Sequence, residues 1–254
     1  MVVYMCTMPL MARQKTAQEV LAMEEVQRAV EAAMAAAIEY LRTSSAPNSE
    51  DAHAIIDRVL AEHDCESPEG HIVAGGEQAV EPHERGHGPI NRGEAIVIDI
   101  FPRSKKTGLW ADMSRTVCIG EPKNSELLIM FDAVVSAQEL AQSMMKPGVR
   151  CKDIHEAAAK LFKDRGYETS GKGTLFTFAE GFVHSIGHGV GHEIHEAPHL
   201  SPKSEEVLME GDVVTNEPGL YYKGLGGIRM EDMLVITKDG SRNLTQFNKD
   251  FVIL

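Results

Sequence analysis

Four acidic residues occur in two pairs with nearly equal spacing. Asp99 and Asp112 are 13 positions apart, and Glu217 and Glu231 are 14 apart. Asp99 lies in the apolar run AIVIDI, and Glu217 follows the strand-like run VVTN. An unpaired carboxylate is costly to bury, and carboxylates that lie close together raise each other's pKa values. If the two pairs meet, a pair of divalent metal ions is the natural way to neutralise them.

A histidine-rich segment, HSIGHGVGHEIHEAPH, is the second candidate for chemistry. It holds five of the eleven histidines: His184, His188, His192, His195 and His199. Glycines at 187, 189 and 191 disfavour a helix, which excludes a helical HExxH zinc site. In an extended chain His184, His188 and His192 would lie on one face. We therefore expect at least one of them to reach a metal.

Each of these residues also has an ordinary interpretation. An aspartate in a hairpin is usually a turn residue, Glu217-Pro218-Gly219 is also typical of a simple turn, and Glu231 with Asp232 is also typical of an exposed charge pair. The apolar residues on either side favour buried acids instead. We interpret His87, His192 and His199 as solvated or as lying outside the ligand set.

The elements that would position these residues follow a repeated order. Residues 16–42 and 124–145 each have the composition of a long helix, and residues 49–63 and 152–165 that of a shorter one. Ser49 is the expected N-cap of the second helix. A stretch of short β-branched runs with Gly and Pro follows each helix pair. The repetition predicts an internal duplication, in which two αβ halves surround one curved, mainly antiparallel sheet.

Composition limits the function classes. With 254 residues, 43% of them apolar, the chain fits one domain over 1–254, with an irregular segment at 1–14. The net charge of −13 opposes binding to nucleic acid or anionic lipid. The four cysteines are far apart, which predicts reduced thiols rather than disulfides or a zinc knuckle. The sequence shows no basic signal region and no apolar run of about 20 residues, so we expect a cytoplasmic protein.

Several motifs together resemble one known family. The segment HSIGHGVGHEIHEAP, followed by TNEPG and GIRMEDMLVIT, is similar to the metallopeptidases that include methionine aminopeptidases, aminopeptidase P and Xaa-Pro dipeptidases. The resemblance extends to IVAGG, PHERGHGPINRGEAIVIDI, ADMSRT and LTQFNKDF. It implies an α+β pita-bread (creatinase/aminopeptidase) fold made of two pseudo-symmetric halves.

The resemblance also implies a two-metal centre with five ligands. Asp99 would bind one metal through both oxygens, Asp112 and Glu231 would bridge the two metals, and His188 and Glu217 would complete the second metal's shell. Glu217 would also carry a proton during catalysis. Four carboxylates and one imidazole favour Mn, with Co, Fe(II) and Zn as alternatives.

Four further residues match positions that act without binding metal in the family. His83, His184 and His195 would hold the substrate carbonyl and the tetrahedral intermediate. Arg229 would orient a ligand carboxylate through its bidentate guanidinium.

The sequence departs from the family pattern at several points. The interval between Asp99 and Asp112 is two residues longer than usual, which predicts a longer hairpin beside the site. Asn216 replaces an apolar residue, and His192 replaces an aliphatic residue or Arg. The separate N-terminal domain of most prolyl-specific members has no counterpart here, so we expect the catalytic domain alone, with a face that a homodimer could use.

The function that these motifs favour is hydrolysis of Xaa-Pro bonds near the N-terminus of a peptide substrate, by an aminopeptidase P or an Xaa-Pro dipeptidase. Methionine aminopeptidase is the alternative within the family, but Ile186-Gly187 replaces the Cys that its bacterial members usually carry there. A catalytically silent binding protein or a metal-free hydrolase is the alternative of another class. Such relatives usually lack one or more ligands, and this chain retains all five.

Overall fold

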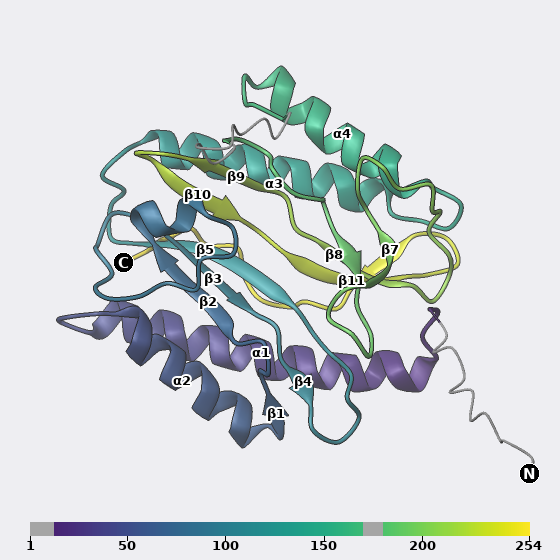
Figure 1. Ribbon diagram of the computed structural model, residues 1–254, viewed down its shortest axis with the longest axis horizontal. Coiled ribbons are helices and arrows are strands. Elements are labelled where there is room, and N and C mark those ends of the chain that lie inside the picture. Colours follow the sequence, from purple (N-terminus) through teal and green to yellow (C-terminus); the bar gives the residue numbers. More distant parts are fainter. Residues whose placement is uncertain (1–12, 170–179) are drawn as a thin grey trace, which may run out of the picture.

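The computed structural model describes residues 13–169 and 180–254, in which two pairs of helices enclose the strands (Figure 1). The helices are α1 (Ala17–Thr43), α2 (Ser49–Glu62), α3 (Glu126–Met144) and α4 (Cys151–Asp164). All four predicted helices are confirmed, with ends within two residues of the expected positions. In Figure 1, α1 and α2 lie along one side of the strands and α3 and α4 along the opposite side.

The N-terminal caps of the first two helices fix where the helices begin. Thr16 and Glu19 form a reciprocal capping box at the start of α1. At α2 the predicted cap, Ser49, is wrong. The Asn48 side chain accepts a hydrogen bond from the amide of Asp51 at 2.8 Å, whereas Ser49 Oγ donates to the carbonyl of Val73 at 2.8 Å. Ser49 therefore ties the helix to the neighbouring strand.

The first half contributes a four-stranded sheet in the order β13-β5-β3-β2. Its strands are β2 (His71–Gly75), β3 (Ala95–Ile100), β5 (Met113–Ile119) and β13 (Val252–Ile253). Strands β2, β3 and β5 are antiparallel, and Asp99 on β3 lies opposite Ile72 and Ser114. The pair β1 (Cys65–Glu66) and β4 (Arg103–Ser104) extends beside this sheet, and the 3-10 helix η1 (Gly76–Val80) follows β2.

The second half contributes a five-stranded sheet in the order β12-β11-β8-β6-β7. Its strands are β6 (His188–Gly189), β7 (Glu196–His199), β8 (Val213–Asn216), β11 (Asp232–Ile236) and β12 (Ser241–Asn243). A hairpin of β9 (Gly219–Tyr222) and β10 (Gly226–Arg229) connects β8 to β11.

The core has two main clusters, one under each pair of helices. Apolar residues of α1 and α2 pack with β3 and β5 and also with Val213, Met233 and Val235 of the second half. Those of α3 and α4 pack with β8, β10 and β11 and also with Ala95 and Cys118 of the first half. Hydrogen bonds between Thr116 on β5 and the backbone of Arg229 on β10 join the two halves. The polar residues at this junction therefore come from both halves.

Within the described residues, no helix is both long enough and apolar enough to cross a bilayer. Cys65, Cys118 and Cys151 are buried free thiols, as predicted. Cys6 and the rest of residues 1–12 lie outside the described residues.

Candidate metal centre

One cavity of about 620 Å³ opens at the junction of the two halves. All nine residues predicted for the site line it: His83, Asp99, Asp112, His184, His188, His195, Glu217, Arg229 and Glu231. They come from segments far apart in the chain, so the fold alone brings them together. The metal and substrate roles assigned to them remain predictions.

The backbone places the four carboxylates at strand ends and strand edges. Asp99 lies near the end of β3, and Asp112 immediately precedes β5. Glu217 directly follows β8, and Glu231 directly precedes β11. The two pairs thus occupy comparable positions in the two halves, as the duplication predicts.

Ser114 connects the two halves at the site. Its backbone carbonyl accepts a hydrogen bond from the amide of Glu231 at 3.0 Å. Its hydroxyl donates to Glu231 Oε2 at 2.8 Å and accepts from Arg229 Nε at 2.9 Å. These bonds fix the carboxylate of Glu231 beside Asp99 and Asp112 instead of leaving it free to turn away.

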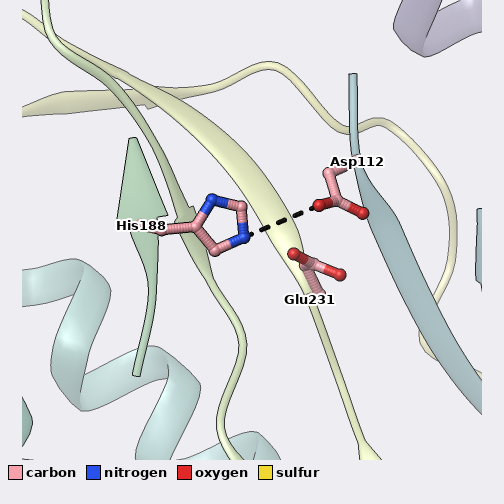
Figure 2. Close-up of side chains that lie close together, drawn as sticks. All are labelled: Asp112, His188 and Glu231. Carbon is pink, nitrogen blue, oxygen red and sulfur yellow. Dashed lines mark ion pairs between the residues drawn. The ribbon is translucent and has the colours of Figure 1, made fainter. Parts of the chain in front are cut away.

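Asp112, His188 and Glu231 converge on one point, as Figure 2 shows. One ligand atom from each lies within 4.8 Å of the other two. His188 Nε2 lies 3.7 Å from Asp112 Oδ2 and 3.2 Å from Glu217 Oε1. An imidazole nitrogen and carboxylate oxygens at this separation form a group that a divalent cation can bind.

The electrostatics of the cluster also fit a cation. Asp99 Oδ1 and Asp112 Oδ1 are buried oxygens without a hydrogen-bond partner. Burial, and the charges of the neighbouring carboxylates, raise the pKa values of Asp112 and Glu231 well above their usual range. Unpartnered buried oxygens are rare because they cost free energy, and a metal ion supplies the missing partner. The residues therefore fit the metal that the predicted family requires.

Arg229 supplies positive charge beside the cluster. It is 4% exposed, and its Nη2 donates to Asp99 Oδ2 at 2.8 Å. Its Nη1 donates to the carbonyl of Pro82 and to the hydroxyl of Tyr221, at 3.1 and 2.9 Å. The guanidinium thus holds one oxygen of Asp99 and leaves the other facing the cluster without a partner.

Glu217 lies between two histidines. Its Oε1 accepts a hydrogen bond from Thr215 Oγ1 at 3.0 Å, and its Oε2 lies 3.9 Å from His184 Nδ1. Burial raises the pKa of this carboxyl, but the hydrogen bond and charge of His188 outweigh burial and lower the pKa to about 2. Glu217 is therefore ionised in the metal-free protein.

The other histidines line different parts of the cavity. His184 is partly buried, and its Nε2 hydrogen-bonds the Tyr221 hydroxyl at 2.9 Å. His195 and His83 are exposed, and the His195 ring lies 4.3 Å from that of His188. Burial lowers the pKa values of His184 and His195, so both imidazoles are neutral near pH 7.

Four residues of the site were not predicted from the sequence. Ser114, Thr215 and Tyr221 hydrogen-bond predicted site residues. His199, expected to be solvated or outside the ligand set, lines the cavity. The strand alternation around Asp112 and Glu217 was the available signal for Ser114 and Thr215, whereas the contact of Tyr221 depends on how the β9–β10 hairpin folds back.

Asn216 and His192, the two residues that depart from the family pattern, are not among the residues that line the cavity. Asn216 donates from Nδ2 to the carbonyl of Gln138 on α3 at 2.8 Å, and its side chain is fully buried. His192 lies 3.9 Å from Glu19 at the start of α1 and does not line the cavity. In the longer hairpin, Trp110 Nε1 donates to the carbonyl of His192 at 3.1 Å. Trp110 thus packs against the histidine-rich segment, and Phe101 is the one residue between Asp99 and Asp112 that lines the cavity.

Known proteins resemble this chain over both halves. A sequence model described as Metallopeptidase family M24 matches residues 22–238. The Xaa-Pro dipeptidase of Pyrococcus furiosus is 32% identical over 240 residues, which make up 94% of this chain and 64% of that protein.

Solved structures give the same result. A prolidase from Pyrococcus furiosus superposes with a TM-score of 0.83 at 32% identity, covering 92% of this chain and 66% of that one. An X-Pro aminopeptidase from Thermotoga maritima superposes with a TM-score of 0.82 at 29% identity, covering 95% and 65%. The predicted α+β pita-bread fold is confirmed by these superpositions. The chain spans just under two thirds of the length of these relatives.

Proposed function

Because the chain belongs to metallopeptidase family M24, we propose that it is a dinuclear-metal peptidase that hydrolyses Xaa-Pro bonds near the N-terminus of peptides. The observation that carries this proposal is the meeting of all nine expected residues on one cavity, with buried carboxylate oxygens that have no partner.

The proposed metal ligands are Asp99, Asp112, His188, Glu217 and Glu231. When bound, the two divalent cations would lower the pKa of a shared water molecule and polarise the scissile carbonyl. Asp112, His188 and Glu231 already point at one another, and Asp99 and Glu217 line the same cavity. The oxygen-rich donor set favours Mn, with Co, Fe(II) and Zn as alternatives.

Glu217 is the proposed proton carrier. Its carboxylate lies beside the proposed metal ligand His188, where it could take a proton from the attacking water and deliver it to the leaving amine. The hydrogen bond from Thr215 fixes Oε1, while Oε2 has no hydrogen bond among the described residues and faces His184 at 3.9 Å. One oxygen is therefore positioned and the other is available for proton transfer.

His83, His184 and His195 are the proposed substrate contacts. Neutral imidazoles can donate a hydrogen bond to the carbonyl oxygen, and such bonds strengthen as negative charge develops on it. Arg229 would act through Asp99, which it orients, and would not touch the substrate.

The Xaa-Pro specificity rests on the relatives and on the cavity wall. The Pyrococcus furiosus relative is named an Xaa-Pro dipeptidase, and the Thermotoga maritima relative an X-Pro aminopeptidase. Ile72, Pro82, Phe101 and Ile194 contribute apolar surface to the cavity wall, which suits a proline ring. Both features support a prolyl substrate, and they apply equally to a dipeptide and a longer peptide.

A substrate panel tests the proposal. The purified chain, supplied with Mn²⁺ or Co²⁺, is assayed against Xaa-Pro dipeptides, Xaa-Pro-Yaa tripeptides and Met-Ala-Ser. We expect cleavage of one or both prolyl classes. Turnover of Met-Ala-Ser alone would indicate a methionine aminopeptidase. A folded chain that binds no cation and cleaves none of the three would indicate a silent binding protein or a metal-free hydrolase.

A further inference from the structure

Lys15, just before helix α1, is a buried charge with no role in the proposed reaction. Its side chain is 2% exposed, and its Nζ lies 2.5 Å from Glu196 Oε1. Nζ also donates to the carbonyl of Arg13 at 2.7 Å. A buried ammonium persists in a fold where it is paired, and removing one partner of such a pair leaves the other charge uncompensated. The ion pair is therefore a fixed connection between the segment before α1 and β7.

Glu196 is the residue after His195 and the first residue of β7. Around it exposure alternates: His195 and His199 are exposed and line the cavity, whereas Glu196 is partly buried and Pro198 is buried. Successive side chains of an extended chain point to opposite faces. Holding the Glu196 carboxylate behind the strand therefore fixes the direction in which His195 projects into the cavity.

The backbone of Gly191 lies directly against the ion pair. A Cβ at Gly191 would overlap both the Glu196 carboxylate and the side chain of Lys15. The Gly191 carbonyl accepts a hydrogen bond from the amide of Trp110 at 2.8 Å, and the amide of Lys15 donates to the carbonyl of Gly211 at 2.7 Å. The backbone of Lys15 is thus held by Gly211, and that of Glu196 is held by the pairing of β7 with Gly189 on β6.

We propose that Lys15 is a positioning residue for His195 and that it acts through Glu196. The consequence for catalysis rests on the proposed function, in which His195 contacts the substrate. The His195 ring lies 4.3 Å from that of the proposed ligand His188, so a shift of β7 moves it relative to the metal cluster. A misplacement of about 1 Å can reduce a rate by about 10²-fold.

The test compares Lys15→Met and Lys15→Arg with a control, Arg13→Gln. Arg13 lies on the same segment, but its Nε donates to Asp212 Oδ1 at 2.8 Å and its Nη2 to the carbonyl of Val207 at 2.7 Å. Arg13→Gln therefore loosens the same segment without removing the partner of Glu196. The readouts are the imidazole NMR signals of His195 in the metal-free protein, the Tm, and kcat and KM with Mn²⁺.

In Lys15→Met we expect the His195 signals to shift while those of the buried His155 stay in place. We also expect kcat to fall about tenfold, within the range for small misplacements, with KM nearly unchanged. Lys15→Arg should restore most of kcat. Arg13→Gln should lower the Tm and leave the His195 signals as in the wild type. If Lys15→Met does not fold, the double variant Lys15→Met/Glu196→Gln, which removes both charges, should show the same shift of His195.

Two results would overturn the proposal. One is a lower Tm in Lys15→Met with wild-type His195 signals and wild-type kcat. The other is an equal displacement of His195 in Arg13→Gln, which would assign the effect to the attachment of the whole segment. The NMR comparison needs no substrate. If the wild type cleaved no Xaa-Pro peptide, the proposed function would be refuted. The His195 signals of the variants would still decide whether Lys15 positions His195.

Discussion

Arg229 donates a hydrogen bond from Nη2 to Asp99 Oδ2 at 2.8 Å, so the second half of the chain orients a carboxylate of the first. The two residues are 130 positions apart. Arg229 is 4% exposed, and it also bonds Ser114 and Tyr221. This one side chain therefore connects the carboxylate cluster, the strand β5 and the β9–β10 hairpin.

Replacing Arg229 by Lys should weaken metal binding while keeping the charge. An ammonium group cannot reproduce the planar set of donors that the guanidinium directs to Asp99 and Ser114. Loss of a residue that orients a metal ligand typically costs about 10- to 100-fold in metal affinity. Isothermal titration with Mn²⁺ measures this effect. Arg242→Lys, at an arginine that is paired with Glu24 on the surface, is the control, and equal affinities for both variants would contradict the role of Arg229.

Replacing Gly219 by Ala should disturb the hydrogen bond between Tyr221 and His184. A Cβ at position 219 would lie 2.5 Å from the Tyr221 hydroxyl and 3.0 Å from His184 Nε2. The two groups must then separate, and we expect kcat/KM to fall about tenfold or more, equivalent to at least about 1.4 kcal/mol of transition-state stabilisation. Gly240→Ala is the matched control, because a Cβ there would meet no atom within 4 Å. Wild-type kinetics in Gly219→Ala would show that this hydrogen bond is dispensable.

Glu217→Gln tests the proton carrier. The amide keeps the size of the side chain but cannot accept a proton, so kcat should fall by about 10²- to 10⁴-fold, the usual contribution of a general base. A Tm measured alongside shows whether the variant is folded. Turnover within a few-fold of wild type would exclude Glu217 as the proton carrier.

Most helices could be predicted from the sequence, because composition and apolar periodicity act over a few neighbouring residues. The N-cap of α2 could not, since Asn48 and Ser49 are both good capping residues. The choice depends on Ser49 reaching the Val73 carbonyl, a contact made by tertiary packing.

The candidate site was predictable to a similar extent. The acids lie within apolar strands or directly beside their ends, and that pattern is local. The position of His199 in the cavity was missed because it depends on the pairing of β6 with β7, where the register shifts at His188 and Gly189. The hydrogen bonds of Tyr221 and the pairing of Lys15 with Glu196 likewise join segments whose contact no sequence spacing indicates.

The stability of the protein should fall in mild acid, in part because of His155. This residue is buried against Phe182, and burial, followed by the charge of His184, lowers the pKa of its imidazole to about 4. An unfolded histidine titrates near pH 6.5, so between about pH 6.5 and 4 the unfolded state binds more protons and the free energy of unfolding decreases as the pH falls. The full shift corresponds to roughly 3 kcal/mol.

Urea unfolding at pH 7.5 and pH 4.5 measures this dependence in the wild type and in His155→Gln. The variant cannot take up the proton, so its free energy of unfolding should change less between the two pH values. The comparison uses the difference between pH values within each protein, which removes the constant cost of the substitution. An identical pH dependence in both proteins would mean that His155 does not contribute.

The central claim is that Asp99, Asp112, His188, Glu217 and Glu231 together hold two divalent cations. Anomalous diffraction from crystals grown with Mn²⁺ tests it most directly. We predict two anomalous peaks in the cavity, with Asp112 and Glu231 touching both. An anomalous map without a peak among these five side chains, from crystals in which the cavity is open to solvent, would contradict the account.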